Sequence, residues 1–140
     1  MYLLDTDVLS ELRKRRRSPA VAKWFARVAD SELYLSAVVL TEIERGIARQ
    51  RTVYPVCAEQ LTAWIEHTLR AFGDRILPLT INIARRWGRL SAEIGNTGLD
   101  LAIAATALEH GLTVVTGNTR HFQRTGARLL DPFRAKPAKP

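Results

Sequence analysis

The stretch from Leu99 to Phe122 constrains the fold of this chain more than any other. After Asp100 it continues with an almost wholly apolar, alanine-rich run that leaves no wet face, so we expect a helix buried on most sides. Gly111 follows this run, as is typical of a helix C-terminus. The β-branched run 112–116 then predicts a strand in the interior of a sheet.

A polar turn, Thr116-Gly117-Asn118, follows this strand. In open α/β sheets, ligands bind in the crevice outside the carboxyl ends of the strands. The turn stands at such an end, and Asp100 stands at the start of the preceding helix. We therefore expect a carboxylate and an amide, from Asp100 and Asn118, to lie side by side at this edge of the sheet.

Short apolar runs alternate with amphipathic helices along the rest of the chain. Strands are predicted at 2–4, 33–35, 76–79, 112–116 and 129–130. The intervening helices are predicted to begin after N-cap residues at Thr6 or Asp7, Ser18, Ser36 and Thr80. This alternation predicts an α/β fold with a mainly parallel sheet and helices on both faces. Right-handed crossovers then bring the carboxyl ends of the strands to one edge.

Two sets of side chains have competing interpretations. Trp24 and Phe25 fall on the inner face of the helix after Ser18, so we expect them in the core rather than as platforms for bases. That helix is predicted to end near Asp30. Solvated surface positions, the default for a glutamate on a helix, are expected for Glu11, Glu44 and Glu93.

The length of 140 residues suits one domain with a single core, predicted over residues 1–133. Residues 134–140 are basic and proline-rich, which favours a disordered tail. The chain has no apolar run long enough to span a bilayer and no signal-peptide pattern at its start. A lone cysteine, Cys57, excludes an internal disulfide and fits a reducing compartment, so a cytoplasmic protein is expected.

Basic residues outnumber acidic ones, 21 against 14, which gives a net charge of +7. Such a surplus suits a nucleic acid, whose phosphates bind basic side chains with release of counterions. The alternative is that the basic charge serves only solubility or an acidic protein partner. The most concentrated basic run is Arg13, Lys14, Arg15, Arg16 and Arg17. Cations suit the C-terminus of a helix, but five in succession exceed what the helix dipole needs. We therefore interpret the run as a contact for RNA phosphates or an acidic partner, with part of it structural.

Three carboxylates can converge at the edge where the strands end, although a solvated position is the default for a helical glutamate such as Glu42. Asp5 ends the first strand, and Glu42 and Asp100 stand near the starts of two helices. Three carboxylates in close contact would repel, and one would take up a proton unless a cation compensated them. A hard divalent cation such as Mg²⁺ suits oxygen ligands of this kind. The histidines lie scattered through the sequence, at His67, His110 and His121, so zinc is not expected.

Three segments, taken in order, carry a family resemblance. They are LLDTDVLSEL at 3–12, LSAVVLTE at 35–42, and a C-terminal segment in which Asp100 precedes LAIAATA and GLTVVT-x-N-x-x-x-F. This combination resembles PIN-domain proteins, most closely the VapC toxins of bacterial toxin–antitoxin pairs and their trafficking-regulator relatives. The resemblance spans residues 2–133. It implies a PIN-like α/β/α sandwich with a central parallel sheet of four or five strands.

The same resemblance implies an activity and partners. It implies an endoribonuclease dependent on Mg²⁺, for which Mn²⁺ can substitute, in which water attacks the phosphorus of an RNA phosphodiester. Such a nuclease would act as the toxin of a toxin–antitoxin system. Its partner would be a small antitoxin that lays an apolar segment in a groove and blocks the acidic edge. A homodimer is also implied.

Site residues are carried over at the matching positions. The resemblance implies that the catalytic set is Asp5, Glu42, Asp100 and Asn118. Within it, Asp5 and Asp100 hold the metal, and Glu42 holds it through a water or orients the attacking water. Thr6 and Thr116 are supporting residues that hydrogen-bond the carboxylates or waters on the metal.

Two positions depart from the family pattern. Many relatives carry a fourth acid where this chain has Asn118, which offers a carbonyl oxygen without a charge. Gly117 stands where an arginine is frequent. Because a lower charge weakens a second metal site, we expect one ion to bind well and a second one only with substrate.

Two other interpretations are open. A catalytically weak PIN-like subunit that binds nucleic acid, or regulates together with a partner protein, would show the same sequence features. A doubly wound nucleotide-binding domain is disfavoured, since no glycine-rich phosphate loop follows the first strand.

Overall fold

The structure is a computed structural model of the chain, and it describes residues 1–134. The strands are β1 (Tyr2–Leu4), β2 (Leu33–Ser36), β3 (Ile76–Leu77), β4 (Thr113–Val115) and β5 (Leu129–Leu130). The α-helices are α1 (Thr6–Arg13), α2 (Pro19–Phe25), α3 (Ala37–Val53), α4 (Pro55–Phe72), α5 (Ile81–Ile94) and α6 (Leu99–His110). The predicted tail 134–140 lies outside the described residues apart from Arg134, so the boundary at residue 133 stays a prediction.

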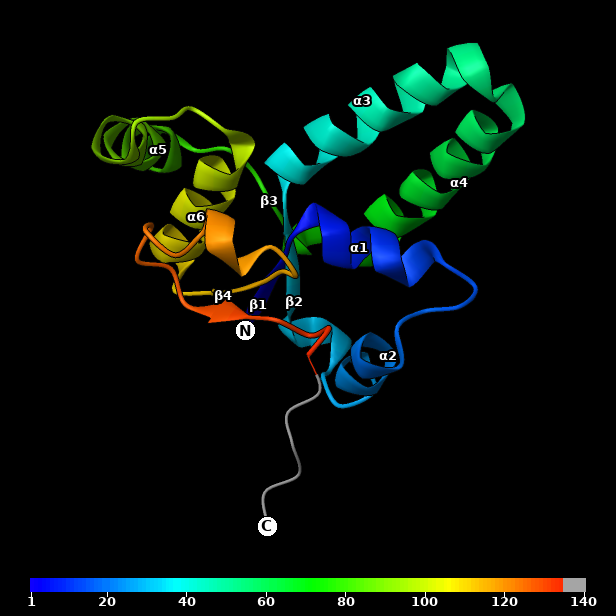
Figure 1. Cartoon of the computed structure of the whole chain (residues 1–140), viewed down its shortest axis with the longest axis horizontal. Helices are drawn as coiled ribbons and strands as arrows, with labels where there is room; N and C mark the ends of the chain where they lie inside the picture. Colours follow the sequence, from blue (N-terminus) through cyan, green and yellow to red (C-terminus); the bar gives the residue numbers. More distant parts are fainter. Residues whose placement is uncertain (135–140) are drawn as a thin grey trace.

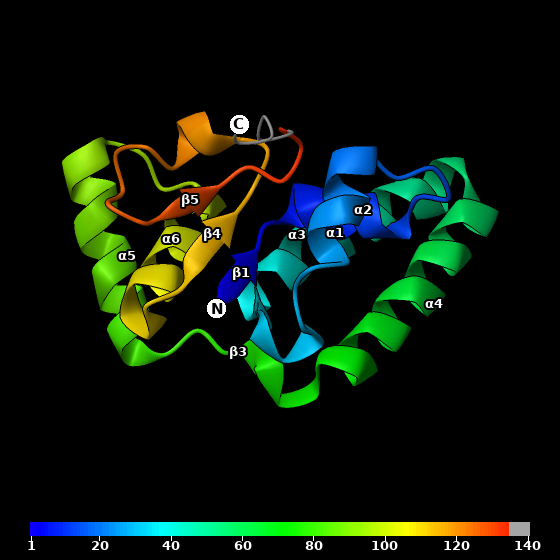
Figure 2. The same cartoon turned by 90° about the horizontal axis from the view of Figure 1, so that it is seen from below.

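The sheet has the order β3-β2-β1-β4-β5, and every neighbouring pair is parallel. The central strand β1 is buried on both faces, since Leu3 and Leu4 have no exposed surface. Figure 1 shows α5 and α6 on one side of the sheet and α1 to α4 on the other, and the view from below in Figure 2 agrees. The predicted α/β/α sandwich with a parallel sheet is thus confirmed.

Three strands differ slightly from their predicted bounds. β4 is one residue shorter than the predicted strand 112–116 at each end. It begins at Thr113 because the Leu112 N–H bonds to the Ala107 carbonyl and so closes α6. The edge strand β3 ends at Leu77, two residues before the predicted end, and the chain then leaves the sheet to begin α5. β2 runs one residue further than predicted, to Ser36, which also caps α3.

Most helix starts follow the predicted capping chemistry. Ser36 Oγ accepts a hydrogen bond from the Val38 N–H at 3.1 Å, and Thr80 Oγ1 caps α5 in the same way. The prediction for α1 is wrong by one residue, since its N-cap is Asp5, whose carboxylate accepts from the Thr6 N–H at 2.8 Å. Asp5 therefore ends β1 and starts α1 at the same time.

The helix α2 ends at Phe25 rather than near Asp30. The N–H groups of Arg27 and Val28 bond to carbonyls three residues back, which tightens the chain into turns that end the helix. Trp24 packs edge-to-face on Tyr2 and on Phe25, with ring centroids 5.1 and 4.9 Å apart. Both rings are half-buried and pack against the core, which agrees with the prediction.

The helix α6 is buried from Leu101 to Ala107, where every residue is at most 1% exposed. It packs between α5 and the sheet, and Gly111 closes it in a left-handed conformation with φ of 66°. This rigid position matters for the site because the N-terminus of α6 carries Asp100. Within residues 1–134, no helix combines the length and apolar character needed to cross a bilayer.

Candidate active site

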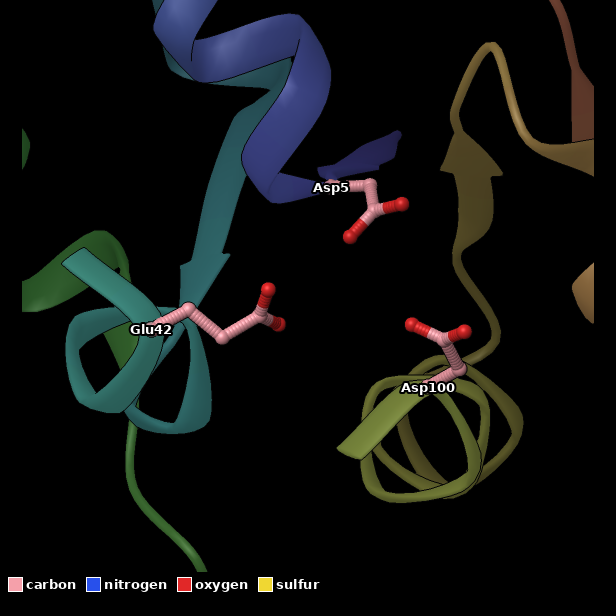
Figure 3. Close-up of side chains that lie close together, drawn as sticks. All are labelled: Asp5, Glu42 and Asp100. Atoms are coloured by element: carbon pink, nitrogen blue, oxygen red, sulfur yellow. The ribbon is translucent and has the colours of Figure 1, made fainter. Parts of the chain in front are cut away.

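Three carboxylates from distant parts of the sequence meet at the carboxyl edge of the sheet. Asp5 stands between β1 and α1, Glu42 lies in the second turn of α3, and Asp100 lies in the first turn of α6. Each offers one oxygen, and these oxygens lie within 4.8 Å of one another. Figure 3 shows the three side chains pointing toward a common space. Because the N-termini of three helices also converge here, their positive dipole ends offset part of the repulsion.

The Asp5 carboxylate is held firmly and lies almost out of water. It is 4% exposed, and its two oxygens accept hydrogen bonds from the Thr6 N–H and the Thr116 hydroxyl, both at 2.8 Å. Burial raises the pKa of Asp5 from 3.8 to about 6, and the negative charge of Asp7 adds to the rise. A carboxylate in this state gains much from a nearby cation.

Glu42 has a buried oxygen without a well-formed hydrogen bond, although the nearby Thr6 hydroxyl lowers the pKa of Glu42 in part. Its Oε1 is buried without a hydrogen-bond partner among residues 1–134, and so is the hydroxyl of Thr6. Burial raises the pKa of Glu42, and the charges of Asp100 and Asp7 raise it further. Since buried polar atoms are normally paired, an unpaired oxygen beside two other carboxylates fits a site that receives a cation.

A cavity of about 400 Å³ opens over the acidic cluster. Its lining consists of Asp5, Thr6, Asp7, Glu42, Asp100, Asn118 and His121. The donors here are mainly carboxylate, hydroxyl and amide oxygens, which suit Mg²⁺ or Mn²⁺ better than softer metals. The residues present therefore fit a hard divalent cation, with Asp5, Glu42 and Asp100 as the residues that would hold it.

Asn118 lines the cavity and is exposed to solvent, which places it at the rim. Its backbone N–H donates to the Thr116 hydroxyl at 3.0 Å, which places both predicted residues in one tight turn. Thr116 is fully buried and links this turn to Asp5. The structure thus brings the predicted catalytic residues and Thr6 to one cavity, with Thr116 buried behind Asp5, and their roles stay predictions.

A glycine is required at position 117 because the backbone there passes close to the side chains of Asp7 and Phe133. A Cβ atom at this position would lie 2.9 Å from Asp7 Oδ2 and 2.9 Å from the Phe133 ring. The Gly117 N–H donates to the same Asp7 oxygen at 2.8 Å. A side chain such as the arginine frequent in relatives would therefore need Asp7 and Phe133 to move.

Two residues of the cavity were not assigned from the sequence. Asp7 is a fourth carboxylate beside the cluster, with its pKa raised by burial. His121 lies in a short 3-10 helix, Thr119–His121, and its Nδ1 is 3.0 Å from Asp100 Oδ2. His121 reaches the cavity because the turn after β4 returns toward α6. The only sequence signal was its position three residues after Asn118.

The basic run 13–17 does not line this cavity. It covers the end of α1 and the connection to α2, and all five side chains are exposed. Lys14 has a structural role, because it contacts Glu11 at 2.8 Å. The prediction that Glu11 is a surface residue is wrong: it is 7% exposed and also accepts the Ser18 N–H at 2.7 Å. Folding of the chain back from α1 to α2 explains this burial.

A parallel five-stranded sheet with an acidic cluster at its carboxyl edge defines a class of α/β proteins suited to bind a divalent cation. The family model of the PIN domain matches residues 2–128, and the chain belongs to this family. The resemblance found in the sequence is thereby confirmed.

Relatives match the chain over nearly its whole length. "VapC ribonuclease Y4jK" of Sinorhizobium fredii is 32% identical over 95% of this chain and 98% of its own length. "Plasmid stability protein StbB" of Pseudomonas syringae pv. tomato is 34% identical, with 96% and 100% covered. In the crystal structure of FitAcB from Neisseria gonorrhoeae, a chain 29% identical superposes with a TM-score of 0.84, covering 96% of this chain and all of that one.

Proposed function

We propose that this chain is a metal-dependent endoribonuclease that acts as the toxin of a toxin–antitoxin pair. The observation that carries the proposal is the convergence of Asp5, Glu42 and Asp100, whose oxygens lie within 4.8 Å of one another. Relatives that match most of the chain are named VapC ribonuclease and toxin FitB, which supports the same reaction class. The cofactor we propose is Mg²⁺, with Mn²⁺ as a substitute.

Each carboxylate has a role that its surroundings support. Asp5 and Asp100 would hold the ion, and the hydrogen bonds to Asp5 from Thr6 and Thr116 fix the direction of its lone pairs. Glu42, with an unpaired oxygen, would hold the ion through a water or orient the water that attacks phosphorus. A bound divalent ion supplies charge neutralisation for the phosphodiester and lowers the pKa of a water.

The rim of the cavity would receive the RNA. Asn118 carries both amide donors and an acceptor, so its side chain can contact a phosphate or ribose without adding charge to the site. Arg13 and Arg15 to Arg17 are exposed, and we propose that they contact RNA phosphates, whereas Lys14 is engaged by Glu11. The contacts from this run would add affinity without choosing a sequence.

A cognate antitoxin is the proposed protein partner. A chain in the structure of FitAB bound to a DNA fragment is 27% identical to this chain, with a TM-score of 0.78. The same fold occurs in a structure described as a toxin–antitoxin complex from Klebsiella pneumoniae. We propose that the antitoxin covers the acidic cavity, that the toxin forms a homodimer and that the pair works in the cytoplasm.

A second candidate is a catalytically weak subunit that binds nucleic acid and regulates together with its partner. The replacement of a fourth acid by Asn118 favours it, as do the DNA-bound complexes of similar chains. An idle acidic site would leave the geometry unchanged, so activity has to separate the two candidates.

The test is incubation of the purified chain with a mixed RNA pool and Mg²⁺. Discrete cleavage that disappears both in EDTA and in Asp5→Ala is the expected result. Cleavage that survives in Asp5→Ala would indicate a contaminating nuclease. An absence of cleavage, together with RNA binding that Asp5→Ala retains, would favour the regulatory subunit.

A further inference from the structure

One short segment, Thr116–His121, hydrogen-bonds three aspartates of the cavity in succession. The bonds join Thr116 to Asp5 at 2.8 Å, Gly117 to Asp7 at 2.8 Å and His121 to Asp100 at 3.0 Å. The segment follows β4 directly, next to the central strand β1, so the sheet fixes its start. It therefore contacts carboxylates at the β1–α1 junction, in α1 and in α6.

We propose that His121 is a positioning residue for cation binding, and that it acts through Asp100. Its ring holds Asp100 Oδ2, which leaves the other oxygen of Asp100 available to an ion shared with Asp5 and Glu42. Figure 3 shows one oxygen of Asp100 turned toward these two side chains. The inference rests on the proposed metal-dependent function and adds to it a residue that the acidic cluster does not include.

The direction of the hydrogen bond follows from the chemistry of the two groups. An ionised carboxylate only accepts, so Nδ1 of His121 must carry the hydrogen. Both the Nδ1–H form of the neutral ring and the charged ring provide that donor, so the role needs no change of protonation. Carboxylates that ligate metals are in turn held by outer hydrogen-bond partners that fix their orientation.

Asp100 depends on His121 more than Asp5 depends on any one partner. Asp5 is nearly buried and has two donors, whereas among residues 1–134 the Asp100 carboxylate is hydrogen-bonded only by His121. The pair is open to water, with His121 61% and Asp100 36% exposed. Exposed pairs contribute little to the stability of a fold. Loss of this hydrogen bond should therefore change the affinity for the ion and leave the stability of the protein nearly unchanged.

The experiment is calorimetric titration of the full chain with Mn²⁺ alone, for wild type and three variants of His121. His121→Ala removes the donor and is expected to weaken Mn²⁺ binding by about 10- to 100-fold. His121→Asn carries its NH₂ group at the position of Nδ1 and should keep an affinity close to wild type. His121→Gln carries that group one bond further out and should resemble the alanine variant.

Two controls separate positioning from folding and from charge. His67→Ala removes an exposed histidine on α4 and should leave Mn²⁺ affinity unchanged. Thermal melts of all variants in EDTA should give the wild-type Tm, because the His121 side chain is mostly exposed.

Each other outcome has a definite meaning. Unchanged affinity in His121→Ala would overturn the positioning role while leaving the metal site intact. An equal loss in the Asn and Ala variants would overturn it too, since the imidazole itself would then be what the ion needs. A wild-type chain that binds no Mn²⁺ would instead refute the metal site on which the proposed function depends.

Discussion

The buried Asp5 carboxylate lowers the stability of the metal-free protein at neutral pH, and Asp5→Asn should remove this destabilisation. Burial, with the charge of Asp7 adding to it, raises the pKa of Asp5 from 3.8 to about 6. Because the folded-state pKa lies above the unfolded value, the contribution of this group to stability is fully present below pH 3.8. It is lost as the pH rises through 6, where the folded carboxyl ionises in a poorly solvated place.

The rise in the pKa of Asp5 corresponds to about 3 kcal/mol at pH 7, since one unit is about 1.4 kcal/mol. An asparagine can still accept from the Thr6 N–H and donate to the Thr116 hydroxyl, so both hydrogen bonds have substitutes. We expect Asp5→Asn in EDTA to be up to about 3 kcal/mol more stable than wild type at pH 7, a rise in Tm of roughly 6–12 °C. At pH 4 the difference should be much smaller.

The assay is urea denaturation of both proteins in EDTA between pH 4 and pH 8, repeated with excess Mg²⁺. An ion at a hundredfold excess over its Kd should stabilise wild type by about 2.7 kcal/mol, and Asp5→Asn by much less. Asp74→Asn, at an exposed aspartate outside the cavity, is the matched control and should follow wild type throughout.

Two results would refute this reasoning. A stability gap between wild type and Asp5→Asn that does not widen from pH 4 to pH 7 would contradict the raised pKa of Asp5. Equal stabilisation of both proteins by Mg²⁺ would show that the ion binds elsewhere.

Three further predictions follow from the turn after β4 and from the basic run. Gly117→Ala places a Cβ 2.9 Å from both Asp7 and Phe133, so urea denaturation should show a loss of about 1–3 kcal/mol; a neutral result would contradict the close approach. Asn118→Asp adds a carboxylate at the rim, beside the four that already line the cavity, and should tighten Mn²⁺ binding by calorimetry; an unchanged affinity would place residue 118 outside the site. Replacing Arg15–Arg17 by glutamine should flatten the dependence of log K for single-stranded RNA on log salt by about 0.7 per lost phosphate contact, and an unaltered slope would assign the run to another partner.

The fold was predictable because hydrophobic pattern and capping chemistry agree along most of the chain. The apolar run 101–107 has no polar face, so it had to be a buried helix, and the β-branched run after Gly111 had to be an interior strand. Capping was less certain at Asp5, where three neighbouring polar residues, Asp5 to Asp7, could each begin the helix. Asp5 is the N-cap because it is the junction residue: its N–H still bonds to the Val115 carbonyl in the sheet, while its own carbonyl already accepts from the Leu9 N–H in α1.

The convergence of Asp5 and Asp100 was predictable because parallel strands bring their carboxyl ends to one edge. Glu42 was assigned through the family resemblance, because a glutamate on a helix is by default a solvated residue. Asp5, Glu42 and Asp100 each stand next to such an end or at a helix start. His121 and the burial of Glu11 were not predictable in this way. Both depend on irregular connections, after β4 and between α1 and α2, whose path follows from tertiary contacts rather than from periodicity.

The most direct test of the metal site is anomalous diffraction from crystals soaked in Mn²⁺ without RNA. We predict one well-occupied ion within bonding distance of oxygens from Asp5 and Asp100, with Glu42 contacting it directly or through a water. Two fully occupied ions would contradict the argument that Asn118 leaves too little charge for a second site. No ion at the carboxyl edge of the sheet would contradict the central claim that these carboxylates form a metal centre.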